Sequence, residues 1–319
     1  MPFDIPGFKI GHDTDQDALT GCTVILCPAS TVGGCDIRGS SPATRETALL
    51  AADKTMQEIH AVVLTGGSAF GLAVADGVMK YLEERDIGYQ TPWLKVPIVP
   101  AAAIFDLNIG NLLIRPGAAE GYKACQAAKE KNDLEGNIGA GTGATVGKWA
   151  GAEFRMKGGL GISSLIDGQL IVGCVAVVNS VGDVVDAEGK VLAGAKKPGG
   201  EFLSGSEPGR RFARGKVFSD TNTTLVVLGT NAVLTKVQVN RLAQRAHDGM
   251  ARAIIPVHTS YDGDLVFALA RRNQVGLASG AAEENFDVVA EAAAEATTRA
   301  IRSAVTKAKS AGGVPGVLG

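Results

Sequence analysis

Two hydrophobic periodicities alternate along the whole chain of 319 residues. Apolar positions that recur every three to four residues predict α-helices, and short runs of β-branched and apolar residues predict strands. The helical pattern is clearest over residues 43–59, 68–86, 116–131, 235–252 and 283–309. Strand-like runs cover residues 22–26, 61–65, 160–166, 169–179, 223–229 and 264–270. Because strands and helices mix throughout, the sequence predicts an α/β or α+β protein.

Residues 187–216 show neither period. They are polar and rich in Gly and Pro, which predicts a long mobile loop. Loops of this length are uncommon inside compact domains and are often functional. This one leads to a polar cluster, 219–224, that runs directly into a predicted strand.

Composition narrows the class of partner. With 45% hydrophobic but only 5% aromatic residues, the core should consist of Ala, Val, Leu and Ile. The length fits one large domain or two average ones. A formal net charge of -2, without any Lys/Arg-rich run, argues against nucleic-acid binding and against an electrostatic membrane anchor. We therefore expect a small-molecule or peptide partner.

The start of the chain has neither the basic residues nor the apolar run of a secretory signal. No stretch offers the ~20 largely apolar residues that span a bilayer. The sequence predicts a cytoplasmic protein with no membrane partner.

No motif indicates a metal or another cofactor. The five cysteines form no CxxC pair, and the four histidines are scattered without an HExxH pattern. The glycine-rich segment 139–149 fails the GxxxxGK[ST] spacing, because Thr142 stands five residues before Gly147 and Trp149 follows Lys148. We expect this segment to shape a pocket and to present Lys148.

Asn222 and Thr223 form a junction that could be a site of self-cleavage. A threonine hydroxyl needs a base, and the α-amino group of the same residue can serve if that residue is the first of its chain. Cleavage between Asn222 and Thr223 would free such an amine, whose ordinary pKa is about 7.7–8.0. The same residues also suit an ordinary loop that enters a buried strand, so other segments have to decide.

Six segments together carry a family resemblance: 36–39, 64–72, 139–143, 157–161, 222–225 and 262–264. In this order they resemble the DmpA-type family of L-aminopeptidase/D-esterases, β-peptidyl aminopeptidases and 6-aminohexanoate-oligomer hydrolases (nylon hydrolases). The Asn-Thr junction and the pair Asp262 and Asp264 resemble the nylon-hydrolase branch most.

The resemblance implies an α+β fold, an αββα four-layer sandwich of the Ntn-hydrolase-like type shared with ornithine acetyltransferases. It implies a single catalytic domain, 1–319, that cleaves itself into a large chain, 1–222, and a small chain, 223–319. It further implies a homo-oligomer, a tetramer of cleaved heterodimers, that acts on a small peptide or oligoamide without a cofactor.

The resemblance also assigns catalytic residues, and their chemistry gives each a reason. Asp262 and Asp264 project to the same side of an extended segment, so both could face Thr223, orient its amine and hold protons. Asn179 could direct its amide at the developing oxyanion, and Lys148 could add positive charge there or hold the Thr223 hydroxyl. The alternatives without a catalytic role are a solvated Asp-Gly-Asp turn for the two acids and an ordinary surface position for Lys148.

Two further residues are candidates for substrate binding. Some family members have a tyrosine in the active site on a Val-Pro-rich segment, where this chain offers Phe105. Asp106 could face a substrate ammonium, as an aminopeptidase requires.

The predicted mechanism is two acyl transfers at one centre. Thr223 first attacks the carbonyl of Asn222 and later, with its free amine as base, attacks substrate amides. The alternatives are acyl transfer like that of ornithine acetyltransferase, and an uncleaved homologue with a binding role.

Overall fold

The computed structural model describes residues 3–203, 222–271 and 285–319. The later part of the loop predicted over 187–216 lies outside these residues. So do the first two residues of the helix predicted over 283–309.

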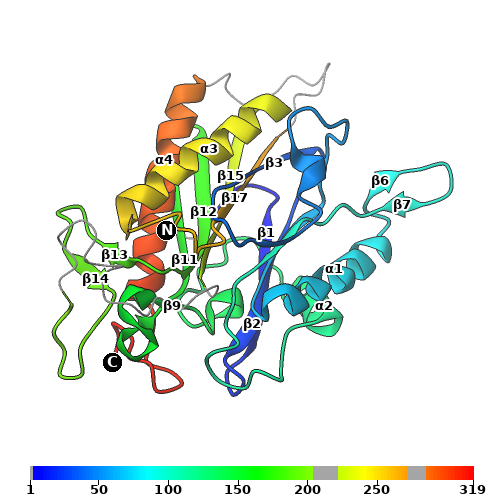
Figure 1. Cartoon of the computed structure of the whole chain (residues 1–319). Coiled ribbons are helices and arrows are strands. Elements are labelled where there is room, and N and C mark those ends of the chain that lie inside the picture. Colours follow the sequence, from blue (N-terminus) through cyan, green and yellow to red (C-terminus); the bar gives the residue numbers. More distant parts are fainter. Residues whose placement is uncertain (1–2, 204–221, 272–284) are drawn as a thin grey trace.

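Two five-stranded sheets form the centre of the molecule (Figure 1). The first sheet has, in spatial order, β1 (Lys9–Asp15), β2 (Thr20–Leu26), β5 (Ala61–Thr65), β8 (Ala101–Ala103) and β4 (Ala43–Arg45). The second has β11 (Gly159–Asp167), β12 (Leu170–Asn179), β15 (Thr223–Val233), β17 (Leu265–Arg271) and β3 (Thr31–Ile37). Smaller sheets pair β6 (Tyr89–Gln90) with β7 (Lys95–Val96), β9 (Thr145–Val146) with β10 (Met156–Lys157), and β13 (Asp183–Val185) with both β14 (Val191–Ala193) and β16 (Ile254–Ile255).

Helices cover the outer face of each sheet. Helices α1 (Val74–Glu83) and α2 (Ala118–Gln126) pack on the first sheet, and α3 (Lys236–Ala253) and α4 (Phe286–Thr306) pack on the second (Figure 1). Short 3-10 helices occur at η1 (Ala48–Leu50), η2 (Ser68–Ala73), η3 (Gly139–Gly141), η4 (Lys148–Ala150) and η5 (Ala152–Phe154). The layers therefore run helix, sheet, sheet, helix, which confirms the predicted αββα sandwich.

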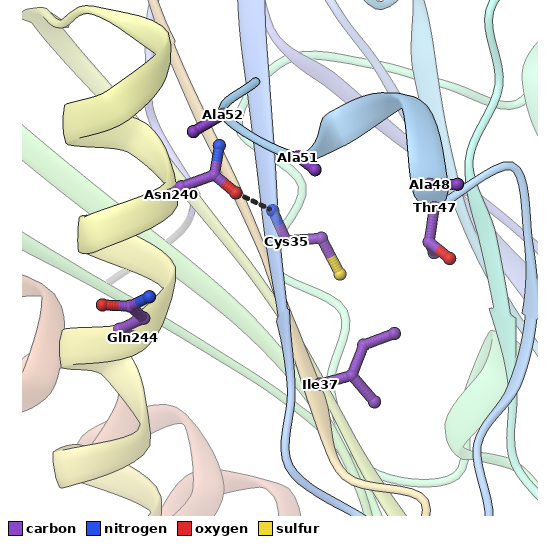
Figure 2. Close-up of a pocket in the computed structure, with 8 residues that line it drawn as sticks. All are labelled: Cys35, Ile37, Thr47, Ala48, Ala51, Ala52, Asn240 and Gln244. Carbon is purple, nitrogen blue, oxygen red and sulfur yellow. Dashed lines mark hydrogen bonds between the residues drawn. The ribbon is translucent and has the colours of Figure 1, made fainter. Parts of the chain in front are cut away.

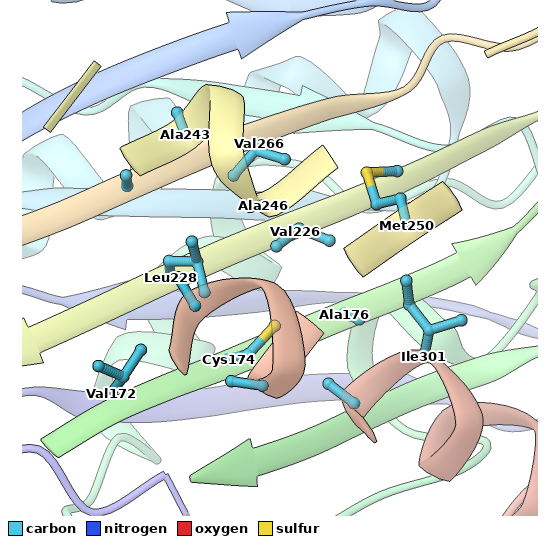
Figure 3. Close-up of a cluster of buried hydrophobic side chains, with 14 of the residues drawn as sticks. Val172, Cys174, Ala176, Val226, Leu228, Ala243, Ala246, Met250, Val266 and Ile301 are labelled. Carbon is cyan, nitrogen blue, oxygen red and sulfur yellow. The ribbon is translucent and has the colours of Figure 1, made fainter. Parts of the chain in front are cut away.

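Side-chain alternation along the second sheet separates two cores. Leu225 and Val227 of β15 face the first sheet, and the intervening Val226 and Leu228 face the helices. The helix-facing core contains Met250 of α3 and the other residues of Figure 3. Because β15 is covered on both faces, its sequence is a continuous apolar run rather than an alternating one.

The second sheet brings distant segments of the chain to one end. In the antiparallel pair β12 and β15, Asn179 lies opposite Thr223. Strand β15 runs parallel to β17, with Leu225 opposite Leu265. The end of β12 and the starts of β15 and β17 therefore meet at the same end of the sheet.

The helix predicted over 43–59 is wrong. Residues 43–45 form strand β4, which pairs with β8 at the edge of the first sheet, and only Ala48–Leu50 form a helical turn. Glu46 adopts a left-handed φ of 57°, which no α-helix can contain. Pairing with the sheet has overridden the helical pattern.

The loop predicted over 187–216 is also wrong in part. Within its described portion, Val191–Ala193 forms β14, and an isolated bridge joins Lys196 to Phe202. The other predicted helices and all six predicted strands are present, although the first turns of the helix predicted at 68–86 are 3-10. In the described part of the chain, no helix combines the length and apolar character needed to cross a membrane.

Candidate active site

Thr223 lies where three strand ends converge. It is the first residue of β15, opposite Asn179 at the end of β12. On the other side, Asn222 bridges to Asp262, just before β17 begins. All of these side chains are buried, at no more than 4% exposure. The fold thus brings together the predicted junction, the predicted oxyanion residue and the predicted acids.

At the Asn222–Thr223 junction, the hydroxyl predicted to be the nucleophile contacts the backbone carbonyl that it is predicted to attack. The Thr223 hydroxyl donates a hydrogen bond to the carbonyl oxygen of Asn222. The same oxygen accepts the backbone N–H of Gly263 at 2.8 Å. A donor is therefore already in place on the atom that would become negative if the hydroxyl attacked this carbonyl.

Asp262 and Asp264 are fixed by donors that point at their carboxylates. The Asp262 Oδ2 accepts the backbone N–H of Thr259 at 3.0 Å and its hydroxyl at 2.6 Å. The Asp264 Oδ1 accepts the N–H of Thr224 at 2.6 Å. Both acids are 1% exposed, so the solvated-turn alternative is wrong.

Asp262 differs from an ordinary carboxylate in how it holds a proton. Burial, with a further contribution from the charge of Asp264, raises the pKa of Asp262 to about 6. A carboxyl with this pKa can both bind and release a proton near neutral pH, as general acid–base catalysis requires.

Lys148 is buried beside these acids. Its Nζ donates to the backbone oxygen of Asn179 at 3.0 Å and to the side-chain Oδ1 of Asn179 at 2.9 Å. Burial lowers the pKa of Lys148 well below its usual range, and nearby Asp262 opposes that shift. With 1% exposure, it is not the surface lysine of the alternative interpretation.

Asn179 links Lys148 to the loop that follows β8. Its Oδ1 also accepts the N–H of Thr145 at 3.0 Å, and its Nδ2 donates to the backbone oxygen of Phe105 at 3.2 Å. This network assigns the orientation of the amide. Phe105 thus contacts the site through its backbone, and binding of substrate by its side chain stays a prediction.

Asp106 follows Phe105 in the loop after β8, but its side chain contacts Thr20 and Gly67 rather than Asn179. Its carboxylate accepts the Thr20 hydroxyl and the N–H of Gly67, both at 2.7 Å, and it is 3% exposed. A Cβ added to Gly66 would lie 2.1 Å from Asp106 Oδ2, so the glycines of the 64–72 motif make room for this carboxylate. Its predicted contact with a substrate ammonium stays a prediction.

Several groups at the site were not among the residues predicted from the sequence. The N–H of Gly263 and the donors of Thr145 and Thr259 depend on tertiary folding. Lys157 is a second buried lysine, which donates to the backbone oxygens of Thr142 and Ala144 at 2.8 and 2.6 Å. Burial lowers its pKa to about 7. Gly263 and Lys157 could have been found in advance, because Gly263 stands between the two acids and Lys157 begins one of the segments that carry the family resemblance.

A separate pocket of about 360 Å³ lies between α3 and the segment around η1, next to the edge strand β3 (Figure 2). Burial raises the pKa of its Cys35 thiol to about 12, so that thiol is not ionised at neutral pH. None of the predicted catalytic residues lines this pocket. In residues 3–203, 222–271 and 285–319, no cluster of three or more His, Cys, Asp or Glu side chains could hold a metal ion.

The profile of peptidase family S58 matches residues 3–318. The chain belongs to peptidase family S58. As an S58 peptidase it is a hydrolase that acts on amide bonds. This membership also confirms the resemblance to DmpA-type enzymes that the motifs indicated.

Relatives of this S58 peptidase agree with that assignment. An uncharacterized aminopeptidase of Mycobacterium leprae is 40% identical, with 99% of this chain and 92% of the relative covered. A 6-aminohexanoate-oligomer endohydrolase of Agromyces is 30% identical, with 84% of this chain and 74% of the relative covered. The L-aminopeptidase D-Ala-esterase/amidase of Ochrobactrum anthropi, described as a variant of the Ntn-hydrolase fold, is 20% identical with a TM-score of 0.72. That comparison covers 98% of this chain and 89% of the other, and it confirms the predicted fold type.

Proposed function

We propose that this peptidase is a self-processing hydrolase with an N-terminal threonine nucleophile, acting on small peptides or oligoamides. One observation carries the proposal. The Thr223 hydroxyl contacts the carbonyl of Asn222, and the N–H of Gly263 already donates to that carbonyl oxygen. An internal threonine in this setting is arranged for attack on its own preceding peptide bond.

Maturation is the first acyl transfer. Thr223 Oγ attacks the carbonyl carbon of Asn222, and the peptide C–N bond breaks as the nitrogen takes up a proton. The product is an ester between Asn222 and the Thr223 hydroxyl, which water hydrolyses. The chain then consists of 1–222, with a carboxylate at Asn222, and 223–319, with a free amine at Thr223.

Turnover is the second acyl transfer. The free amine accepts the hydroxyl proton as Oγ attacks a substrate amide, and the leaving amine takes up a proton. Water then releases the acyl group. Asn179, oriented by Lys148, stabilises the oxyanion, and Asp262 and Asp264 orient the amine and hold protons.

The site motifs and the relatives support a proposal for the substrate class. One relative is named an aminopeptidase and another a 6-aminohexanoate-oligomer endohydrolase. The Asn-Thr junction and the aspartate pair resemble the second type. We therefore propose short linear amides, either peptides with a free amino end or oligoamides, as substrates. Phe105 and Asp106 are the proposed substrate-binding residues.

Assembly and location belong to the same proposal. We propose a tetramer of cleaved heterodimers in the cytoplasm, with no nucleic-acid or membrane partner. Light scattering of the purified protein measures the assembly, and fractionation of the native host measures the location.

Intact mass tests the nucleophile. The wild-type protein, incubated at neutral pH, should yield two chains with a new N-terminus at Thr223, and should hydrolyse aminoacyl amides or 6-aminohexanoate oligomers. Thr223→Ala should remain a single chain without activity. Acyl exchange onto ornithine without amide hydrolysis would point to the acetyltransferase alternative.

Thr224→Val is the matched control for Thr223→Ala. The Thr224 hydroxyl is buried and has no hydrogen-bond partner among the described residues. Replacing it with an isosteric methyl group should leave cleavage intact and stabilise the fold by about 1 kcal/mol. A wild-type protein that stays uncleaved and inactive would overturn the proposed function.

A further inference from the structure

A row of hydrogen-bonded groups leads from the proposed active site towards the surface. Asp264 Oδ2 contacts His258 Nδ1 at 2.9 Å, and His258 Nε2 contacts His247 Nδ1 at 3.1 Å. His247 Nε2 in turn faces the backbone oxygen of Asp36 at 3.2 Å and its carboxylate at 3.3 Å. We call Asp264, His258, His247 and Asp36 the histidine row.

The ends of the histidine row fix how many protons it holds. Among the described residues, the hydrogen-bonding partners of His247 Nε2 are oxygen acceptors of Asp36, so this nitrogen must carry a proton. One proton must also lie between the two imidazoles. A third must lie between Asp264 Oδ2 and His258 Nδ1, because a carboxylate and a bare ring nitrogen are both acceptors. Two neutral imidazoles and a carboxylate supply only two of these three protons.

We propose that the histidine row holds one extra proton, shared between Asp264 and His258, and that His258 is a positioning residue that compensates the charge of Asp264 beside Thr223. This inference rests on the proposed function for its catalytic consequence. The number of protons in the histidine row does not depend on the proposed function.

His258 has a backbone built for this contact. Its φ of 55° lies in the left-handed region, which is costly for a residue other than glycine. In this conformation its backbone N–H also donates to Asp264 Oδ2, at 3.1 Å. The next residue, Thr259, holds Asp262 in the same way. One short segment therefore orients both acids.

The contacts of the row place the extra proton at its inner end, between Asp264 and His258. Burial and the neighbouring His258 lower the pKa of His247 to about 4, so His247 is the neutral ring. His258 faces the Asp264 carboxylate directly, and Asp262 adds a second acid nearby. At the outer end, Arg38 pairs with Asp36 at 2.8 Å.

The extra proton has a consequence for Thr223 as a base. With it, Asp264 and His258 together are neutral. Without it, Lys148 would still face Asp264, but the pair of Asp264 and His258 would carry one more negative charge. That added charge would favour the ammonium form of the freed Thr223 amine and would raise the pKa of that amine. Less of the base would then be available at neutral pH.

Nitrogen-15 NMR of labelled histidines tests the proton count. The chain has only four histidines, His12, His60, His247 and His258, so His258→Asn and His247→Gln assign the two signals of the row. The Thr223→Ala protein is used, so that the result does not depend on cleavage or activity. We expect His258 to be an imidazolium or to share its Nδ1 proton with Asp264 at pH 7. We expect His247 to be neutral with its proton on Nε2. A neutral His258 that carries a proton only on Nδ1, or a His247 without a proton on Nε2, would overturn the count.

The pH profile of kcat/KM tests the consequence. Asn tolerates left-handed backbone and can donate to Asp264 but cannot hold the extra proton. We expect His258→Asn to move the acid limb of the profile upward by about one pH unit, with a similar plateau at high pH. The control is His60→Asn, because the Asn oxygen can accept the Ile98 N–H that His60 now accepts.

The outcomes separate the two proposals. A uniform loss of rate in His258→Asn, with the acid limb unmoved, would mean that His258 is only structural. A wild-type protein without hydrolytic activity would overturn the proposed function, whereas the NMR result would still decide the proton count.

Discussion

At the scale of single residues, three ionisable side chains lie buried together in the proposed active site. Lys148, Asp262 and Asp264 are each at most 1% exposed. Each takes part in hydrogen bonds or electrostatic contacts with buried neighbours, so removing one alters the balance of charge in a medium where charge is costly. Single substitutions at these positions should therefore reduce activity far more than substitutions of exposed charges do.

Lys148→Met should lower both self-cleavage and hydrolysis by about 100-fold or more, the usual loss when a group that supports an oxyanion is removed. The substitution removes one of the donors that orient the Asn179 amide and leaves the N–H of Thr145 on the same oxygen. Mass spectrometry follows the first rate, and a chromogenic amide follows the second. The control is Lys123→Met on α2, whose side chain is 61% exposed and which should behave as wild type. Equal rates for the two variants would remove Lys148 from the mechanism.

Asp262 should make the stability of the protein depend on pH. The pKa of Asp262 is raised from 3.8 to about 6 on folding, so the folded state binds its proton more tightly than the unfolded state. This site contributes stability that is complete below about pH 4 and is lost as the pH rises through about 6, by about 2 to 3 kcal/mol.

Urea denaturation at about pH 4 and pH 7.5 measures this dependence. Thr223→Ala provides an uncleaved reference, and the same protein with Asp262→Asn lacks the titrating group. The double variant should lose less stability between the two pH values than the reference does. The same pH dependence in both proteins would show that Asp262 has an ordinary pKa.

At the scale of elements, the turn just before β17 positions the groups that surround the Asn222–Thr223 bond. Gly263 donates to Asn222, and a Cβ at this position would lie 2.9 Å from Thr223 Oγ1 and 2.6 Å from the backbone oxygen of Ser41. The turn thus has room for a nucleophile only because it lacks a side chain.

Gly263→Ala should slow self-cleavage strongly and destabilise the fold by about 1–3 kcal/mol, because the methyl group overpacks the junction. Intact mass over time and urea denaturation measure the two effects. Gly117→Ala is the control, since its nearest neighbour would be 3.7 Å away. Rapid cleavage in Gly263→Ala would show that the turn is looser than its contacts indicate.

Sequence periodicity predicted correctly the helices and strands whose own apolar residues are numerous enough to require burial. Strands β12 and β15 are continuous apolar runs, and α3 and α4 have clear apolar faces. Strands β1 and β3 were missed because their sequences, KIGHDTD and TVGGCDI, are rich in polar residues and glycine. They become strands because β2 and β17 offer them partners.

The residues of the proposed active site also divide into those visible in the local sequence and those brought in by tertiary contacts. The junction and the two acids are adjacent in sequence to strong strands, so their motifs were visible. His258, Thr259 and Lys157 act through contacts made only in the folded chain, and nothing in the spacing of the four histidines indicates that two of them touch.

At the scale of the whole molecule, β15 should hold the cleaved chains together. The residues from Thr223 to Thr230 are all buried between neighbouring strands and between two cores. Native mass spectrometry should find 1–222 and 223–319 in one particle, and separation should require denaturant. Separate elution of the two chains in native buffer would contradict this packing.

Gly263 lies some forty residues after the carbonyl to which it donates, so the proposed self-cleavage depends on a part of the chain that folds around the junction from further along the sequence. A chain that has emerged only as far as Thr223 has the nucleophile and its target but lacks the donor and both acids. Under the proposed mechanism, cleavage therefore has to follow the docking of β17, the last strand of this sheet along the chain. Copies in which β17 has not docked would stay uncleaved and would lack the catalytic amine.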